Sequence, residues 1–382
     1  MRRSPDRLWK ERFAVRTVAR GAAVAHFTLP GVALLLTLCA HLVFARPPQP
    51  ARQAQQPARD SAPVVPAVSP FVDVHAHLDP TDINASIRIA LAAMPKENAA
   101  RIFFLASPST FSMAPKDRFD SELLLSATKD YRDKLSVLGG GGTLNAMIQQ
   151  AVESGDAGPA VQKKFKDRAE EILRQGAIGF GEMTAEHFPT STPYQYAPAD
   201  HPLFFILADI AAEHNVPIDL HMEAVPQDMP LPSHLKSPPN PTHLHANIAA
   251  FERLLAHNPR AKIIWDHAGW DNTGYRTPEL CRRLLQAHAN LYMELKLDAQ
   301  DVEMNPPLVN GASGPLKPEW MKLLQDYPDR FIIGSDQHYP MPEQAGPQRW
   351  QEIVLLFNQL PGDLRLKIGT ENATHIYNLK SK

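Results

Sequence analysis

Short apolar runs alternate with amphipathic helical stretches along the whole chain from Phe71 onward. Eight of these runs lack the polar alternation of a half-exposed strand, which is the pattern of parallel strands covered on both faces. The stretches between them place apolar residues at helical spacing, as in helices that pack one face on a sheet. The predicted strands are Phe71–His77, Arg101–Ala106, Leu135–Gly139, Ala177–Met183, Val216–Met222, Lys262–His267, Asn290–Leu295 and Phe331–Asp336.

A predicted helix follows each predicted strand, although the first one is short. Eight strand–helix units over residues 71–382 predict a single-domain α/β fold, a (β/α)8 TIM barrel, which typically needs about 250 residues. A doubly wound open sheet is the alternative, but no Gly-x-Gly-x-x-Gly sequence follows a strand. Four glycines after the third strand, Gly139–Gly142, are expected to form a flexible loop. The predicted helices are Asp82–Ala93, Asp120–Lys134, Gln162–Arg174, His201–His214, His243–His257, Thr277–His288, Lys317–Tyr327 and Gln348–Leu360.

The C-terminal ends of the predicted strands carry side chains of the kind that bind metals. In a (β/α)8 barrel these ends form the active site. His75 and His77 are two residues apart and therefore point to the same side of the first strand. Neutral imidazoles and carboxylates suit zinc, manganese, nickel or iron. A single such histidine is most simply a hydrogen-bonded structural residue. Ligand-type side chains at five of eight strand ends instead predict one shared site, made of His75, His77, Glu182, His221, His267 and Asp336.

Five segments, in the order FVDVHAH, GFGEM, DLHME, WDHAG and GSDQH, resemble the strand ends of metal-dependent hydrolases of the amidohydrolase superfamily. The tail IGTENATHIYNL is similar to the closing helix of its amidohydrolase-related (amidohydrolase 2-like) branch, in which an asparagine like Asn372 precedes the final helix. The resemblance extends from about Phe71 to Leu379. It is specific for the superfamily but names no substrate, because loops set the specificity of such barrels.

The resemblance implies roles for individual residues. His75 and His77 match the paired ligands of the first metal. Asp336 matches the aspartate that binds this metal and also serves as the proton shuttle. His221 and His267 match the ligands of the second metal in two-metal members.

Glu182 bears on the number of metal ions. It stands where two-metal members have a bridging carboxylate, often a carboxylated lysine. Many amidohydrolase-related members have no carboxylate there and use one metal. Glu182 therefore favours two divalent ions over one, with zinc first among the metals and manganese, nickel or iron as alternatives.

The expected function is that of a metal-dependent hydrolase acting on a small molecule. A metal lowers the pKa of bound water to about 7, so that hydroxide forms at neutral pH. Asp336 can accept the proton of this water and deliver it to the leaving group. The bond expected is C–O or C–N, as in a lactone, ester or amide. The alternatives are a metal-dependent decarboxylase (a lyase) of the same superfamily, a phosphoesterase, and a non-enzymatic metal-binding protein, which would need no proton shuttle.

Three further residues are candidates for substrate binding. Lys296 and Glu294 share one face of the seventh strand, where a cation could bind a substrate carboxylate or phosphate. The alternatives for Lys296 are an ion pair with Glu294 or exposure to solvent. Trp270 either lines the pocket or packs at the surface. His338 either contacts the substrate or caps a loop.

A proline-rich segment, Val225–Pro241, holds six of the 36 prolines and directly follows the fifth strand. It must therefore lie on the catalytic face of the barrel. Long loops at this position are commonly specificity elements or lids. Proline restricts the conformations of the loop and lowers the entropy that it loses on ordering.

Residues 1–45 have the pattern of a signal peptide or a membrane anchor. Seven basic and two acidic side chains in residues 1–20 precede an uncharged stretch, residues 21–45, and a bilayer-spanning helix needs about 20 residues. Basic residues on its N-terminal side predict that the rest of the chain is exported. A cleaved segment would make the protein periplasmic or secreted, whereas an uncleaved one would anchor it through residues 22–44. A cytosolic protein with a misassigned start codon is the third interpretation.

Residues 46–70 join this segment to the barrel. They hold seven prolines and no periodic apolar pattern, which predicts a stiff, disordered tether. The whole chain has a net charge of −2, and its first 70 residues are basic, so residues 71–382 are acidic. An acidic domain argues against nucleic acid as a partner, and two cysteines exclude a disulfide framework. The oligomeric state stays open, a homo-oligomer included.

Overall fold

The structure is a computed structural model that describes residues 69–113, 119–188, 193–237, 239–297, 308–309, 314–340 and 349–380. The expected signal or anchor segment (residues 1–45) and nearly all of the linker (residues 46–70) lie outside these ranges. Their roles, and the export of the protein, therefore stay predictions. Among the described residues, no helix is long and apolar enough to cross a membrane.

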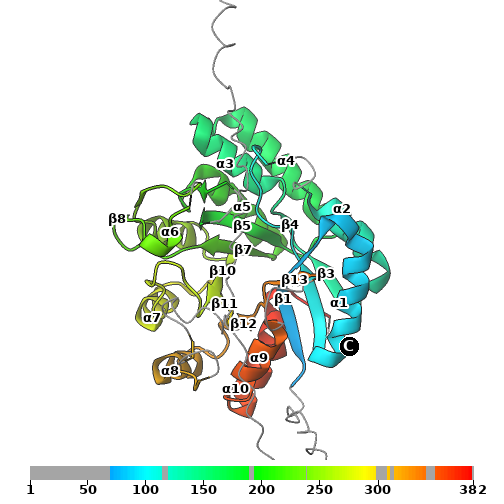
Figure 1. Ribbon diagram of the computed structural model, residues 1–382. Coiled ribbons are helices and arrows are strands. Elements are labelled where there is room, and N and C mark those ends of the chain that lie inside the picture. The colour runs from blue at the N-terminus through cyan, green and yellow to red at the C-terminus, as the bar shows by residue number, and fades with distance from the viewer. Residues whose placement is uncertain are drawn as a thin grey trace, which may run out of the picture. The chain divides into compact units, whose positions relative to one another are not determined.

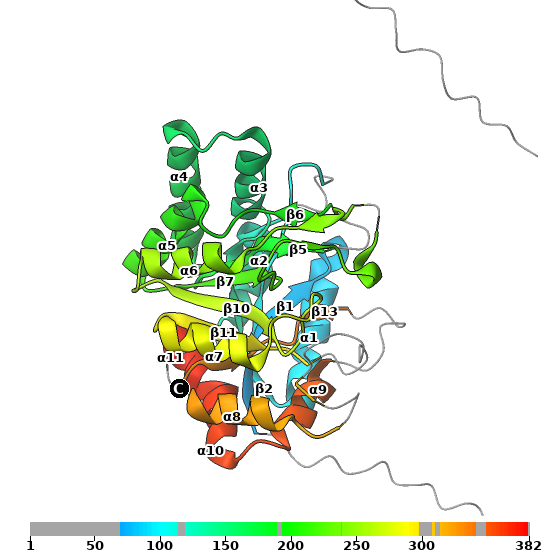
Figure 2. The same ribbon diagram turned by 90° about the vertical axis from the view of Figure 1, so that its left-hand side faces the viewer.

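Parallel strands lie at the centre of the described chain, and helices cover their outer side (Figure 1, and Figure 2 from the side). These strands are β1 (Phe71–Leu78), β2 (Ala99–Phe104), β3 (Leu135–Val137), β4 (Gly139–Gly140), β5 (Phe180–His187), β7 (Pro217–Met222), β10 (Lys262–Ala268), β11 (Leu291–Leu295) and β12 (Phe331–Ile333). Their hydrogen-bonded order is β3-β2-β1-β12-β11-β10-β7-β5-β4, and each pair is parallel. This arrangement fits the predicted TIM barrel.

The ring closes through the third predicted strand. β3 and β4 are two parts of one strand on either side of Leu138. The Leu138 N–H donates to the Phe104 carbonyl (3.1 Å), and the Gly139 N–H donates to the Gly179 carbonyl (3.1 Å). The same strand therefore pairs with β2 on one side and with β5 on the other, which leaves no open edge on this path.

The four glycines Gly139–Gly142 do not form the expected flexible loop. The first two make up β4, and all four are buried. A Cβ on Gly139 would lie 2.6 Å from Cγ2 of Ile172, and a Cβ on Gly141 would overlap the Ala106 carbonyl. Close packing of the backbone therefore explains the glycines here, because any side chain would collide with its neighbours.

Helices follow the barrel strands as the sequence predicted, with two differences. The predicted helix His243–His257 begins only at Ile248, and His243–Leu244 form the short strand β9. Two helices, α3 (Leu144–Ser154) and α4 (Pro159–Gln175), connect β4 to β5 where one was expected. They lie next to each other at one end of the molecule (Figure 2). The other helices are α1 (Ile83–Glu97), α2 (Ser121–Thr128), α5 (Pro202–His214), α6 (Ile248–His257), α7 (Pro278–Ala287), α8 (Pro318–Asp326), α9 (Arg349–Phe357), α10 (Gly362–Leu366) and α11 (Asn372–Ile376).

Apolar side chains fill the barrel interior from the end at which the strands begin. Tyr377 follows α11 and closes this end, with its ring 4.7 Å from that of Phe103 in an edge-on contact. Asn372 fastens the closing helix, because its Nδ2 donates to the carbonyls of Pro328 and Phe331, both at 2.8 Å. Polar residues are thus left to the opposite end. The interior group consists of Val72, Val74, Phe103, Leu105, Leu138, Ile264, Ile332, Ala373, Ile376 and Tyr377.

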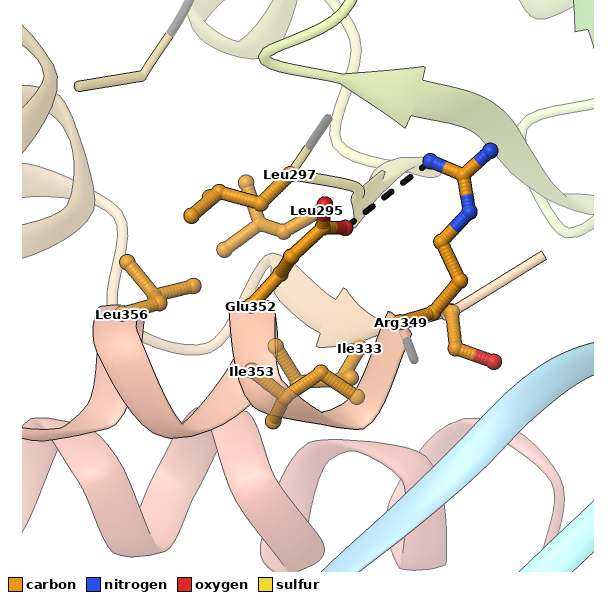
Figure 3. Close-up of a pocket in the computed structure, with 9 residues that line it drawn as sticks. Leu295, Leu297, Ile333, Arg349, Glu352, Ile353 and Leu356 are labelled. Carbon is orange, nitrogen blue, oxygen red and sulfur yellow. Dashed lines mark ion pairs between the residues drawn. The ribbon is translucent and has the colours of Figure 1, made fainter. Parts of the chain in front are cut away.

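A small cavity lies between β11, β12 and α9, on the outer side of the barrel wall (Figure 3). Aliphatic side chains such as Leu295, Ile333 and Leu356 line it. Arg349 and Glu352 of α9 form an ion pair of 3.8 Å beside them. The cavity therefore belongs to the packing of helix against sheet and not to the polar end of the barrel.

The proline-rich segment Val225–Pro241 is folded against the chain that surrounds it. Its short strand β8 (Met229–Pro230) pairs with β9 (His243–Leu244). The Val225 N–H donates to Oδ1 of Asn247 (3.0 Å), and Nε2 of His234 lies 2.9 Å from the Asn272 carbonyl. These contacts make the segment a wall beside the C-terminal end of β7. Its apolar residues Val225, Leu231 and Leu235 form a separate small cluster with Phe188 and Leu244.

Glu97, the last residue of α1, is a buried carboxyl group whose loss of hydration is offset only weakly by hydrogen bonding. It is 5% exposed, and the Tyr339 hydroxyl donates to its Oε2 at 3.4 Å. Burial, together with the nearby Asp73 carboxylate, raises the pKa of Glu97 to about 7. The folded state therefore holds this proton more tightly than the unfolded chain does.

We expect Glu97 to make the fold less stable as the pH rises from about 4.5 to about 7, because the folded protein must then ionise a buried group. The shift in pKa corresponds to roughly 3 kcal/mol. Glu97→Gln should therefore be more stable than the wild type at pH ~8, with a gain that shrinks towards pH ~5. Urea unfolding at both pH values measures this, and Glu213→Gln, an exposed position on α5, is the control. A gain that is equal at both pH values would contradict the prediction.

Candidate metal centre

The six predicted ligands meet at the C-terminal end of the barrel. All are buried except Asp336, whose side chain is 19% exposed. The structure thus brings together every residue that the sequence predicted as a ligand, and their role as ligands stays a proposal. His75 and His77 lie on β1, Glu182 on β5, His221 on β7, His267 on β10 and Asp336 just after β12.

Four of these side chains form a first group. Nε2 of His75 and Nε2 of His77 lie 3.2 Å apart, and Oε2 of Glu182 lies 3.5 Å from each. Oδ1 of Asp336 is 3.2 Å from Nε2 of His77 and 4.0 Å from Nε2 of His75. Two ligands of a tetrahedral zinc ion, each at about 2.0–2.1 Å from it, stand roughly 3.3 Å apart. The spacing of the four atoms therefore fits one ion.

Hydrogen bonds on the far side of the two rings determine which nitrogens face this group. Nδ1 of His75 lies 3.1 Å from Oε2 of Glu294, and Nδ1 of His77 lies 3.1 Å from the Leu105 carbonyl. A carboxylate and a carbonyl can only accept, so each Nδ1 carries the proton and each Nε2 presents a lone pair. Two lone pairs at 3.2 Å repel each other unless a proton or a metal ion lies between them. This donor set fits a metal ion.

Glu182, His221 and His267 form a second group, in which the ligand atoms lie within 4.8 Å of one another. Oε1 of Glu182 is 2.9 Å from Nδ1 of His221, so the two oxygens of Glu182 face different groups. Nδ1 of His267 is 3.1 Å from Oε1 of Glu294, which directs the lone pair of Nε2 away from Glu294. Glu182 thus has the position of a bridging carboxylate.

Glu294 on β11 (Leu291–Leu295) connects the two groups from inside the barrel. It is fully buried, and its two oxygens accept from Nδ1 of His75 and from Nδ1 of His267. Gly334 leaves room for it, because a Cβ at that position would overlap the Glu294 carboxyl group. Burial raises the pKa of Glu294 to about 7. The sequence placed Glu294 on the same strand face as Lys296 but did not assign it to the histidines, since strand parity shows direction but not the partner.

Two further carboxyl groups, Asp219 and Asp266, lie deeper in the barrel and were missed from the sequence. Both are fully buried, and none of their four oxygens has a hydrogen-bond partner among the described residues. Oδ1 of Asp219 is 3.5 Å from Nδ1 of His75. Burial lowers the pKa of His75, but Glu294 and Asp219 outweigh it and raise this pKa well above its usual value. The centre therefore attracts positive charge strongly.

Two of the predicted ligands, His267 and Asp336, have a left-handed backbone, with φ of 62° and 53°. Residues other than glycine seldom adopt this conformation, and the surroundings must hold it. The Asp336 N–H donates to the His75 carbonyl (2.8 Å), and the N–H of the preceding Ser335 donates to Oδ1 of Asp73 (2.9 Å). The predicted strand Phe331–Asp336 therefore ends earlier, at Ile333, and the chain turns to present the Asp336 carboxylate. It then continues as β13 (Gln337–Tyr339) beside β1.

The three candidates for substrate binding lie next to these groups. Nζ of Lys296 is 2.6 Å from Oδ2 of Asp336 and 4.1 Å from the centre of the Trp270 ring. Lys296 is 4% exposed and its ion pair among the described residues is with Asp336, so the expected alternatives of a Glu294 ion pair and of a solvent-facing lysine are both wrong. Nε2 of His338 lies 3.8 Å from Oδ1 of Asp336. Contact of these residues with a substrate stays a proposal.

Comparison with known proteins gives a family match. A family model described as Amidohydrolase matches residues 72–379. Among solved structures, a candidate 2-pyrone-4,6-dicarboxylic acid hydrolase from Pseudomonas putida is similar, with 12% identity, a TM-score of 0.50, and coverage of 82% of this chain and 98% of that chain. A mutant PTE-like lactonase from Deinococcus radiodurans has 14% identity, a TM-score of 0.48, and coverage of 80% and 96%. The first of these likenesses, with its TM-score of 0.50 and 12% identity, indicates a shared fold only. No curated protein sequence matches the chain.

We expect Glu294→Gln to weaken metal binding by about 10- to 100-fold. The amide has one oxygen acceptor and one N–H2 donor, so it cannot accept protons from both His75 and His267. Competition with a chelating dye for zinc measures the affinity. Glu186→Gln is the matched control, because Glu186 is also fully buried on β5 but accepts from Tyr194 and Asn247 instead. Equal zinc affinities for the two variants would refute the role of Glu294.

Proposed function

The chain belongs to the amidohydrolase family, and on this premise we propose that it is a metal-dependent hydrolase that cleaves a C–O or C–N bond of a small molecule. The observation that carries the proposal is the pair of donor groups that share Glu182. Its two oxygens reach toward His75 and His77 on one side and toward His221 on the other. A carboxylate in this position supports two divalent ions, zinc first, with manganese, nickel or iron as alternatives.

A divalent ion at this site supplies Lewis acidity and lowers the pKa of a water molecule to about 7. The chain itself supplies the base. Oδ1 of Asp336 faces the first group, 3.2 Å from Nε2 of His77, while Oδ2 is held by Lys296. Burial raises the pKa of Asp336, but Lys296, His77 and His267 together outweigh it and hold this pKa well below its usual value. Asp336 is therefore ionised at neutral pH and ready to accept a proton from the attacking water.

The same carboxyl group then delivers its proton to the leaving oxygen or nitrogen. Its left-handed backbone and the hydrogen bond from its N–H to the His75 carbonyl keep it beside the first group throughout. The surrounding wall, formed in part by Val225–Pro241, restricts which substrates reach it. Lactones, esters and amides are the substrate classes that this chemistry serves.

We expect Asp336→Asn to lower kcat by about 100-fold or more, because an amide cannot take up the proton. Asparagine keeps an oxygen donor, so most of the bound metal should remain. Hydrolysis of a panel of lactones, esters and amides, with metal content measured alongside, tests both parts. Asp326→Asn is the control, since Asp326 is also paired with a lysine, Lys322, but lies on α8 outside the barrel. Full activity of Asp336→Asn would remove the proton shuttle from the proposal.

The number of ions separates the hydrolase from the alternative decarboxylase. Elemental analysis of the purified protein should give about two divalent ions per chain, and Glu182→Ala should lower this number, because it removes the oxygen that both groups share. One ion per chain that Glu182→Ala leaves in place, together with release of carbon dioxide from a carboxylated substrate, would instead indicate the decarboxylase.

A further inference from the structure

We propose that Lys296 and Trp270 form a subsite for a carboxylate group of the substrate, beside the metal centre. The inference rests on the proposed function and adds the charge of the substrate to it. Lys296 is placed on the inner face of the barrel, one residue past β11, and is 4% exposed. A buried ammonium group loses its hydration and must find partners within the site.

The described residues give Lys296 fewer partners than it can use. The ammonium group has three N–H donors, and one of them donates to Oδ2 of Asp336 at 2.6 Å. The Trp270 ring offers its face, 4.1 Å from Nζ, which is an electrostatic contact rather than a hydrogen-bond acceptor. Within the described part of the chain, no second oxygen accepts from Lys296. Two donors are thus available to a ligand.

Trp270, whose ring face Lys296 contacts, also carries a donor that is unpaired within the described part of the chain. Its Nε1 is buried and has no hydrogen-bond partner among the described residues. The ring also lies 5.9 Å from that of His267, edge-on. The indole therefore contacts both Lys296 and His267 of the second group. An N–H group of this kind is costly to leave unpaired, and an oxygen of a bound ligand would satisfy it.

The charges favour an anion here. The Asp336 carboxylate is the only anionic partner of Lys296 among the described residues, and it is shared, because its other oxygen faces His75 and His77. Glu294 cannot replace it, because both of its oxygens accept from histidines. Once Asp336 also serves a divalent ion, the positive charge of Lys296 is only partly compensated. A group with one negative charge and two oxygens matches the remaining donors better than a doubly charged phosphate.

Binding of matched probes to the metal-loaded protein tests the subsite without turnover. Glutarate and its neutral diamide, glutaramide, have similar size and differ in charge. Isothermal titration should show that the wild type binds glutarate about tenfold or more tightly than glutaramide. Lys296→Met should remove most of this preference, and Lys296→Arg should keep it. Lys322→Met, an exposed lysine on α8, makes the same change in net charge and should behave as the wild type.

Two outcomes would overturn the subsite. If Lys296→Met folds and loads metal but still prefers glutarate, the metal ions alone select the anion. If Lys296→Met weakens the binding of inorganic phosphate more than it weakens the binding of glutarate, the ligand is not a carboxylate. Circular dichroism and metal content establish the state of the variant, and Lys296→Gln replaces it if the methionine variant fails to fold.

Kinetics separate this inference from the proposed function. γ-Butyrolactone bearing a γ-carboxylate and the same lactone bearing a γ-carboxamide form a reactive pair. Lys296→Met should lower kcat/KM for the carboxylate about tenfold more than for the carboxamide. Equal losses for both would mean that Lys296 only positions Asp336, which overturns the subsite and leaves the hydrolase intact. No hydrolysis of any lactone, ester or amide by the wild type would instead overturn the proposed function, while the titration still reports on the subsite.

Discussion

The centre depends on one buried carboxyl group that accepts protons from two imidazoles. Glu294 holds Nδ1 of His75 with one oxygen and Nδ1 of His267 with the other. These hydrogen bonds select the tautomer of each ring, and with it the direction in which Nε2 presents its lone pair. Because Glu294 is fully buried, water cannot compete for either proton. The neighbouring Asp219 adds negative charge beneath His75, so the electrostatics of this end of the barrel favour a cation.

The barrel stabilises this arrangement because it separates apolar from polar side chains along its axis. Tyr377 and the inward-facing aliphatic residues fill the end at which the strands begin, and the candidate ligands occupy the other end. Glycines remove side chains where elements come closest, at Gly139 in the wall and at Gly334 against Glu294. The packed frame in turn holds Asp336 in a left-handed conformation that an isolated chain would seldom adopt.

Asp336 lies between the first group of candidate ligands and Lys296. One of its oxygens faces His77 and the other is held by Lys296, which lies against Trp270. The proposed base and the proposed cation for a substrate anion are therefore neighbours, and a change in one alters the other. The proline-rich wall beyond β7 lies at the same end of the barrel, fastened by Asn247 and by the contact between His234 and Asn272.

Most of the fold and all six candidate ligands could be predicted from the sequence, because strand and helix periodicity and the residue at each strand end are local properties. The periodic pattern determined the order of elements, and the residue types His75, His77, Glu182, His221, His267 and Asp336 determined that a metal would suit their meeting point. Only the tertiary structure decided the partners. In the folded chain Lys296 pairs with Asp336 instead of Glu294, and Glu294 accepts from two histidines. Gly139 and Gly140 form part of the barrel wall instead of the expected loop. These choices depend on distances between residues far apart in the chain, and such distances exist only once the barrel has closed.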